Sequence, residues 1–224
     1  MFEFKTLVGK HYLMTRIKGN SKTGDAVMVS IIPAKGIDLD TIRAKGSSAC
    51  PRTCPNKCAF GKRKTGTCYT YKRPGGGQGV LGGLKKAFET SQTVSMETWL
   101  RKTTSAADVY GFLRAGEYGD PSITPEVAAG TKALLKNLKE LDVKYTCYTH
   151  MWKKDDTLKG MAMASVESPK MTEKANSMGW KTFEVVDRHS PEKKLCPAQQ
   201  VKKFTCAKCG LCDGAHNNVK IREH

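Results

Sequence analysis

The stretch TPEVAAGTKALLKNLKELDVKYTCYT, residues 124–149, carries the pattern that decides the fold. It opens with Thr-Pro-Glu, a capping side chain followed by a first-turn proline and an acid, which is typical of a helix start. Val127 and four leucines that end at Leu141 then recur at helical spacing and predict a stripe that faces the core. Residues 143–149 follow at once and predict a strand. A helix that leads directly into a strand is the unit from which parallel sheets are built.

The same alternation continues on both sides of this stretch. Further predicted elements are a helix over 96–105 capped by Ser95, strands over 109–113, 161–166 and 181–186, and a helix that Ser168-Pro169 begins and Gly179 ends. Residues 12–17 and 27–32 flank a turn and predict an N-terminal hairpin. We therefore expect an α/β protein, either a partial (β/α) barrel or an open parallel sheet, with an N-terminal hairpin and cysteine-rich metal-binding loops.

Composition and length suit one compact domain in three parts. Residues 1–80 hold the N-terminal strands and a basic, cysteine-rich loop, 81–190 the α/β core, and 191–224 a C-terminal cysteine segment. The start is too polar for a signal peptide, and no apolar run approaches the roughly 20 residues of a membrane helix. We therefore expect a cytoplasmic protein without a membrane partner.

Parallel sheets place their chemistry at the carboxyl ends of the strands. That rule selects Arg114, Glu117, Asp120, His150 and Glu167, each of which lies at or just after a predicted strand. The first three fall in the turn R-A-G-E-Y-G-D and are the candidate catalytic residues, with Glu117 and Asp120 also candidates for holding a cofactor. For each of the five, an ordinary polar loop residue is the alternative interpretation.

The nine cysteines divide into two groups of four and one left over. Near the C-terminus, Cys206, Cys209 and Cys212 follow one another at two-residue gaps, and Cys196 precedes them. Three thiolates at such gaps suit three corners of a [4Fe–4S] cube, with Cys196 as the fourth ligand. Zinc, and thiols without metal, are the alternatives. Lysines 202, 203 and 208 lie beside these thiols and favour the thiolate form.

The N-terminal group is Cys50, Cys54, Cys58 and Cys68, which we expect to form a second metal site or to share one cluster with the C-terminal group. Without a secretory signal, these cysteines indicate metal ligands in a reducing compartment rather than disulfides. The ninth, Cys147, lies in an apolar stretch and is expected to be an inert core thiol.

The formal net charge of +17 is typical of a protein that meets a polyanion, most often nucleic acid. From residue 45 to residue 73 the chain has eight basic residues and no acidic one. The candidate nucleic-acid contacts in this stretch are Arg52, Lys57, Lys62, Arg63, Lys64, Lys72 and Arg73. An incidental basic surface is the alternative, and tyrosines 69 and 71 can either stack on bases or pack the loop against the domain.

A cysteine-rich loop that follows an early strand is the arrangement of radical S-adenosylmethionine enzymes. Their usual motif is C-x3-C-x2-C, whereas here both gaps are three residues, which places the open iron of such a cluster in question. The chain as a whole resembles the phage-encoded gene product eighty-eight family, itself similar to a truncated radical-SAM barrel. The matching pieces are Cys50-Pro51, Cys68-Tyr69, R-A-G-E-Y-G-D, Tyr148-Thr149, Ala164-Ser165-Val166, C-P-A-Q at 196–199, T-C-A-K-C-G-L-C at 205–212 and His224.

The resemblance implies a virus-encoded protein with bound iron and sulfur in the cytoplasm of a bacterial host, and it supplies no reaction. We expect a structural or electron-carrying iron–sulfur protein that binds nucleic acid and meets a redox partner. A radical-SAM-type enzyme, which uses S-adenosylmethionine, and a zinc-stabilised nucleic-acid-binding protein are the alternatives.

Overall fold

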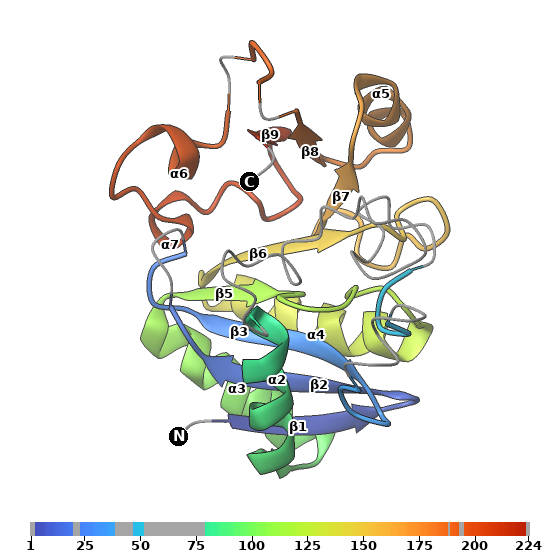
Figure 1. The fold of residues 1–224 in the computed structure, drawn as a ribbon, viewed down its shortest axis with the longest axis vertical. Coiled ribbons are helices and arrows are strands. Elements are labelled where there is room, and N and C mark those ends of the chain that lie inside the picture. Colours follow the sequence, from blue (N-terminus) through green and yellow to red (C-terminus); the bar gives the residue numbers. More distant parts are fainter. Residues whose placement is uncertain are drawn as a thin grey trace.

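A computed structural model describes residues 3–19, 23–38, 47–51, 79–187, 189–192 and 195–222. Its centre is a nine-stranded sheet in the order β4-β1-β2-β3-β5-β6-β7-β8-β9 (Figure 1). The strands are β1 (Glu3–Val8), β2 (His11–Ile17), β3 (Val27–Pro33), β4 (Gln92–Thr93), β5 (Phe112–Ala115), β6 (Lys144–Thr149), β7 (Met163–Val166), β8 (Thr182–Val186) and β9 (Val219–Arg222).

The sheet is mixed but mostly parallel. Strands β1, β2 and β3 pair antiparallel, which confirms the N-terminal hairpin, and every step from β3 to β9 is parallel. In the described chain the end strands β4 and β9 each pair on one side only, so the sheet is open and not a closed barrel. Strands from all three parts of the sequence contribute to this one sheet.

Six helices accompany the sheet in the described residues. They are α2 (Gly79–Thr90), α3 (Met96–Tyr110), α4 (Pro125–Glu140), α5 (Pro169–Ser177), α6 (Pro197–Gln200) and α7 (Cys206–Cys209). The three predicted caps are confirmed, since the side chains of Ser95, Thr124 and Ser168 each accept a hydrogen bond from a backbone N–H three residues ahead. None of the described helices combines the length and the apolar character needed to cross a lipid bilayer.

Three parts of the fold differ from the sequence-based expectation. The apolar run 109–113 is not one strand: α3 continues to Tyr110, where Val109 is 79% exposed, and β5 begins only at Phe112 after a left-handed Gly111. Helix α2, which was not among the predicted helices, begins at Gly79 inside a glycine-rich stretch. Strand β8 is not the last, because β9 pairs beside it.

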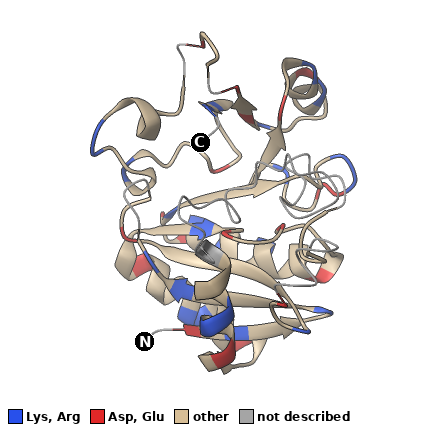
Figure 2. Cartoon of the chain, in the orientation of Figure 1, with Lys and Arg blue, Asp and Glu red and all other residues tan. Residues whose placement is uncertain are grey.

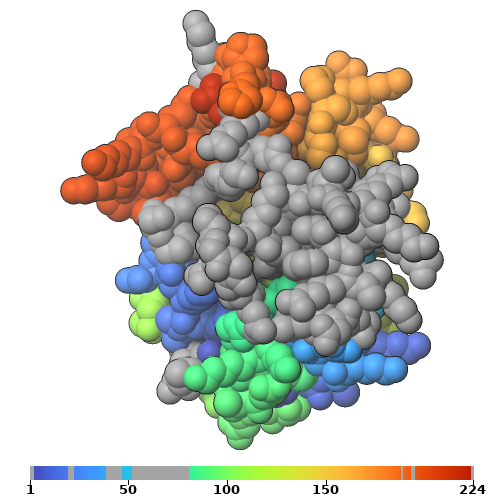
Figure 3. All heavy atoms as spheres, in the orientation of Figure 1, coloured from blue at the N-terminus to red at the C-terminus, as the bar shows by residue number. Residues whose placement is uncertain are grey.

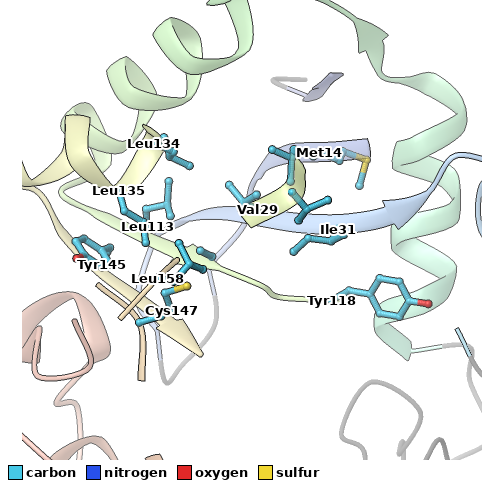
Figure 4. Close-up of a cluster of buried hydrophobic side chains, with 14 of the residues drawn as sticks. Met14, Val29, Ile31, Leu113, Tyr118, Leu134, Leu135, Tyr145, Cys147 and Leu158 are labelled. Carbon is cyan, nitrogen blue, oxygen red and sulfur yellow. The ribbon is translucent and has the colours of Figure 1, made fainter. Parts of the chain in front are cut away.

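One face of the sheet packs against helices to form the main core. Figure 4 shows Leu134 and Leu135 of α4 beside Leu113 of β5, with Tyr145 and Cys147 of β6 in the same cluster. Cys147 is fully buried there, as its apolar sequence neighbourhood predicts. Burial raises the pKa of its thiol, which therefore stays protonated and unreactive.

The other face of the sheet carries polar side chains. Parallel register sets Met28, Arg114 and Thr146 side by side on neighbouring strands. Because side chains alternate along a strand, these residues lie opposite the face that α3 and α4 cover, on the side where α2 packs beside Arg16. We call this surface the polar face and define it by Arg16, Ser30, Arg114, Thr146 and Tyr148.

Candidate metal centre

The C-terminal cysteine segment is built from two short helices and the loops around them. Thr205 caps α7, where its side chain accepts a hydrogen bond from the Lys208 backbone N–H, and Gly210 ends the helix in a left-handed conformation. The motif C-A-K-C therefore forms a single helical turn. Because residues three apart share a face of a helix, Cys206 and Cys209 lie on the same side of that turn. Figure 3 shows the segment at the surface, at one end of the molecule.

Each part of this segment is tied to the sheet by backbone hydrogen bonds. The Cys196 N–H donates to the Lys220 carbonyl of β9 at 2.7 Å, and the Cys147 N–H of β6 donates to the Cys212 carbonyl at 3.4 Å. The Ala207 N–H donates to the Thr23 carbonyl ahead of β3 at 3.2 Å. Strands β6 and β9 and the turn before β3 therefore fix where this segment lies.

Side chains reinforce the same placement. Gln199 accepts from the Arg222 backbone N–H and donates to the Arg222 carbonyl, which holds α6 against β9. The Tyr145 hydroxyl donates to the Asp213 carbonyl at 3.3 Å, and the Lys144 ammonium donates to the Lys208 carbonyl at 3.0 Å. The loop from α7 to residue 213 is thus held at both its ends by β6.

None of the four cysteines is joined in a disulfide to another described residue. Cys196 and Cys212 are buried in a small cluster with Met163 and with Tyr148. Cys206 packs against a second cluster that contains Met28. Met28, Tyr148 and Met163 all project from the polar face, so three thiols that are separate in sequence meet one side of the sheet.

The other three thiols all affect the pKa of the Cys212 thiol. Its pKa is raised to about 12, chiefly by burial, and the neighbouring thiols of Cys196, Cys206 and Cys209 raise it further. A hydrogen bond from the Tyr148 side chain acts in the opposite direction. Among the described residues, no three or more His, Cys, Asp or Glu side chains are arranged so that they could hold a metal ion.

Tyr148 and Arg114 complete the surroundings of the thiols. Burial raises the pKa of Tyr148 well above its ordinary value, Cys212 and Cys206 add to the rise, and the Arg114 guanidinium opposes it. The Tyr148 ring packs on Phe183 with a centroid distance of 4.3 Å. Neither the tyrosine nor its contact with Cys212 could be predicted from the spacing of the cysteines. The signals in the sequence were the Tyr148-Thr149 pair quoted above and the alternation of β6, which sets Tyr148 on the face opposite Cys147.

The donor set fits a thiolate-ligated metal cluster in its chemistry. Soft thiolate ligands select zinc, copper(I) and iron–sulfur clusters, and four of them are the usual ligand set of a [4Fe–4S] cluster. The lysines that neighbour the cysteines in sequence would offset part of the negative charge of four thiolates.

The three candidate residues of the turn R-A-G-E-Y-G-D do not form one cluster. Arg114 lies within β5 and faces Tyr148, as described above. Glu117 forms an ion pair with Arg16, at 2.5 Å between Oε2 and Nη2, and accepts a hydrogen bond from the Ser30 hydroxyl at 3.2 Å. Both partners of this ion pair are buried, so the Glu117 carboxylate is engaged in joining the turn to β2 and β3.

Asp120 is engaged at the ends of the strands. It accepts hydrogen bonds from the Thr149 hydroxyl at 2.7 Å and from the His150 backbone N–H at 2.8 Å. Burial raises its pKa, against these hydrogen bonds and the nearby His150 ring. His150 lies 3.8 Å from Asp120 and 3.5 Å from Glu167, beside a cavity of about 80 Å³. Three of the residues selected for their position at the carboxyl ends of strands, Asp120, His150 and Glu167, therefore lie close together.

Of the N-terminal cysteines, the described residues include only Cys50. Its segment docks on the turn after β5, where the Asp120 N–H donates to the Ala49 carbonyl at 2.8 Å. Cys50 thus lies near the carboxyl ends of β3 and β5, whereas Cys206 packs near the start of both strands. Cys54, Cys58, Cys68 and the basic residues Arg52, Lys57, Lys62, Arg63, Lys64, Lys72 and Arg73 lie outside the described residues.

No family model, no curated protein and no solved structure matches this chain. The similarity to the gene product eighty-eight family therefore stays a prediction from the sequence motifs quoted above.

Proposed function

We propose that this chain is an iron–sulfur protein that holds a [4Fe–4S] cluster with Cys196, Cys206, Cys209 and Cys212, in a structural or electron-carrying role. The observation that carries the proposal is that four thiols, at the N-cap of α6, in α7 and in the following loop, lie on one side of the sheet, although no three of them are arranged in the described residues to hold a metal ion. A cluster with four protein ligands has no iron open to a substrate, so stabilisation of the fold or electron transfer is the chemistry it would supply.

Metal analysis of protein purified without oxygen tests this proposal. We expect about four irons and four sulfides per chain and a broad absorbance near roughly 400 nm. Alanine at Cys206 or Cys212 should abolish this absorbance. Alanine at Cys147 is the matched control, because that thiol is buried on the opposite face of the same sheet, and the variant should keep its iron.

Each alternative has its own result in the same measurement. Colourless protein with stoichiometric zinc would replace the proposal with a zinc-stabilised module. About eight irons per chain would add a second cluster, for which Cys50, Cys54, Cys58 and Cys68 are the candidate ligands. Oxygen-free protein without iron, sulfide or zinc would refute any metal centre.

Nucleic-acid binding is the second part of the proposal, and the net charge of +17 supports it. Figure 2 shows that lysines and arginines in the described chain are spread over strands, helices and the C-terminal segment. Filter binding to DNA and RNA at increasing salt tests it. We expect affinity to fall steeply with salt, because contacts with phosphate release counterions. Affinity that does not change with salt would contradict such contacts.

A radical-SAM-type reaction is the second candidate function. The contact between the Cys50 segment and the turn after β5 favours this reaction. Cofactor chemistry in parallel sheets lies at the carboxyl ends of the strands, and this turn follows such an end. Anaerobic reconstitution with S-adenosylmethionine and a reductant tests it. Formation of 5′-deoxyadenosine above a cluster-free control would support this reaction, and its absence would dismiss it.

A further inference from the structure

A small cavity lies at the carboxyl ends of two neighbouring strands, away from the cysteine segment. Strands β6 and β7 run parallel and side by side (Figure 1), so the residues that follow them lie at the same edge of the sheet. His150 follows β6, and Glu167 follows β7. Both line a cavity of about 80 Å³, whose walls also include Trp152, Lys153, Lys154 and Met171.

The Glu167 carboxylate has unused hydrogen-bonding capacity beside this cavity. Both of its oxygens are buried, and neither accepts a hydrogen bond from the described residues. The closest charged partner is the His150 ring, whose Nε2 lies 3.5 Å from Oε1. Buried polar groups in proteins nearly always have a hydrogen-bond partner. A buried carboxylate with two unused oxygens at a cavity therefore calls for a donor that comes from outside the described chain.

The wall on the His150 side is held in place by Asp120. One Asp120 oxygen accepts a hydrogen bond from the His150 backbone N–H at 2.8 Å, and the other accepts from the Thr149 hydroxyl at 2.7 Å. The opposite imidazole nitrogen, Nδ1, lies 3.8 Å from Asp120. The His150 ring thus stands between two carboxylates, and its hydrogen-bonded backbone keeps it at the edge of the cavity.

The charges around the cavity have both signs. The Glu167 side chain is only 20% exposed, whereas Lys153 and Lys154 are exposed, so the carboxylate lies inside and the ammonium groups lie at the entrance. The Lys153 ammonium lies 4.9 Å from the centre of the Trp152 ring, which forms an apolar wall. A simple cation would suit Glu167 but would be repelled by the two lysines. A ligand with an ammonium group at one end and a carboxylate at the other would suit both.

The volume limits the ligand further. A cavity of about 80 Å³ has room for roughly five water-sized groups. We propose that this cavity binds a small α-amino acid such as glycine, with its ammonium group on the Glu167 carboxylate and its carboxylate toward Lys153 and Lys154. Hydrogen bonds between charged groups are the strong ones among protein hydrogen bonds. None of the lining residues is a cysteine, so this inference does not depend on a metal cluster.

The experiment follows the indole N–H signals of the three tryptophans in heteronuclear NMR spectra of the full chain while glycine is added. The spectrum of Trp152→Phe identifies the Trp152 signal. We expect glycine to shift this signal in a saturable way and to leave those of Trp99 and Trp180, which do not line the cavity, unchanged. Methylammonium and acetate each carry only one of the two charges and should bind about tenfold more weakly or less.

Two pairs of variants test the two ends of the ligand. Glu167→Gln should weaken glycine binding by about tenfold or more, whereas Glu173→Gln, which removes an exposed carboxylate from α5, should not change it. Lys154→Met should lower the affinity for glycine but not that for methylammonium, because only glycine has a carboxylate to pair with the lysine. Lys170→Met, at an exposed position of α5, should change neither affinity.

The outcomes are distinct. The inference would be overturned if glycine gave no saturable shift of the Trp152 signal, if Glu167→Gln bound glycine as tightly as wild type, or if leucine, which is too large for the cavity, bound as well as glycine. If Glu167→Gln does not fold, the four ligands on wild type decide: a preference for glycine supports the inference, and no preference overturns it. Glycine binding by protein that contains no iron would refute the proposed function alone.

Discussion

Removal of the Glu117 carboxylate should destabilise the protein far more than an ordinary loop substitution. The side chains of Arg16 and Glu117 are only 6% and 7% exposed, and their closest atoms are 2.5 Å apart. Breaking a buried ion pair leaves a charge without its counterpart in a poorly solvated position. In Glu117→Ala that charge is the Arg16 guanidinium, and the Ser30 hydroxyl also loses an acceptor.

The magnitude follows from the geometry. At an effective dielectric constant of about 20, two unit charges about 4 Å apart attract each other by about 4 kcal/mol. Measured losses on breaking buried pairs, about 3 to 5 kcal/mol, bracket this value. We therefore expect Glu117→Ala to lower the free energy of unfolding by about 3 to 5 kcal/mol.

Urea unfolding followed by circular dichroism measures the effect. Glu140→Ala, at the exposed end of α4, is the control and should unfold close to wild type. The double variant Arg16→Met, Glu117→Ala should recover part of the loss, because it buries no charge without a partner. A Glu117→Ala variant within about 1 kcal/mol of wild type, or a double variant whose loss is the sum of the single losses, would refute the argument.

Two further predictions concern the same turn. Gly119 has a φ of +77°, and a Cβ there would lie 2.6 Å from the Ile31 carbonyl oxygen, so Gly119→Ala should cost at least about 2 kcal/mol of unfolding free energy. Gly111→Ala, with φ of +68° and open space around its Cβ, should lose only about 1 kcal/mol in the same urea assay, and equal losses would contradict the steric reason. Because burial raises the pKa of Asp120, the folded protein binds this proton more tightly than the unfolded chain does. The stability that wild type shows relative to Asp120→Asn should therefore fall as pH rises from the ordinary pKa of Asp120 to its raised one, and a rise in urea titrations across that window would contradict the prediction.

Local signals in the sequence predicted the elements that depend on local contacts. The caps at Ser95, Thr124 and Ser168 act on backbone groups three residues away, so sequence alone was enough to place the starts of three helices. The four-residue strand β9 was not predicted, because a run that short becomes a strand only through its pairing with β8. Helix α2 was missed because its glycines weaken the helical signal, although Leu84 is fully buried.

In the candidate site, too, the features that depend on local spacing could be predicted, and those that depend on contacts between distant residues could not. The spacing of the cysteines marked Cys196 to Cys212 as a group, and the structure brings their thiols to one side of the sheet. The contact between Tyr148 and Cys212 spans 64 residues and depends on which face of β6 each side chain takes, so no local pattern could reveal it. The ion pair between Arg16 and Glu117 was hidden for the same reason, since it joins β2 to the turn after β5, 101 residues further along the chain.

Strand β9 holds part of the C-terminal cysteine segment in place. The Cys196 N–H is held by the Lys220 carbonyl, and Gln199 is held by the backbone of Arg222, both of which come later in the chain than all four thiols. Cys196 therefore lacks this backbone hydrogen bond until β9 is in place. The arrangement of the thiol segment therefore depends on a strand that follows it in the sequence and that pairs in turn with β8.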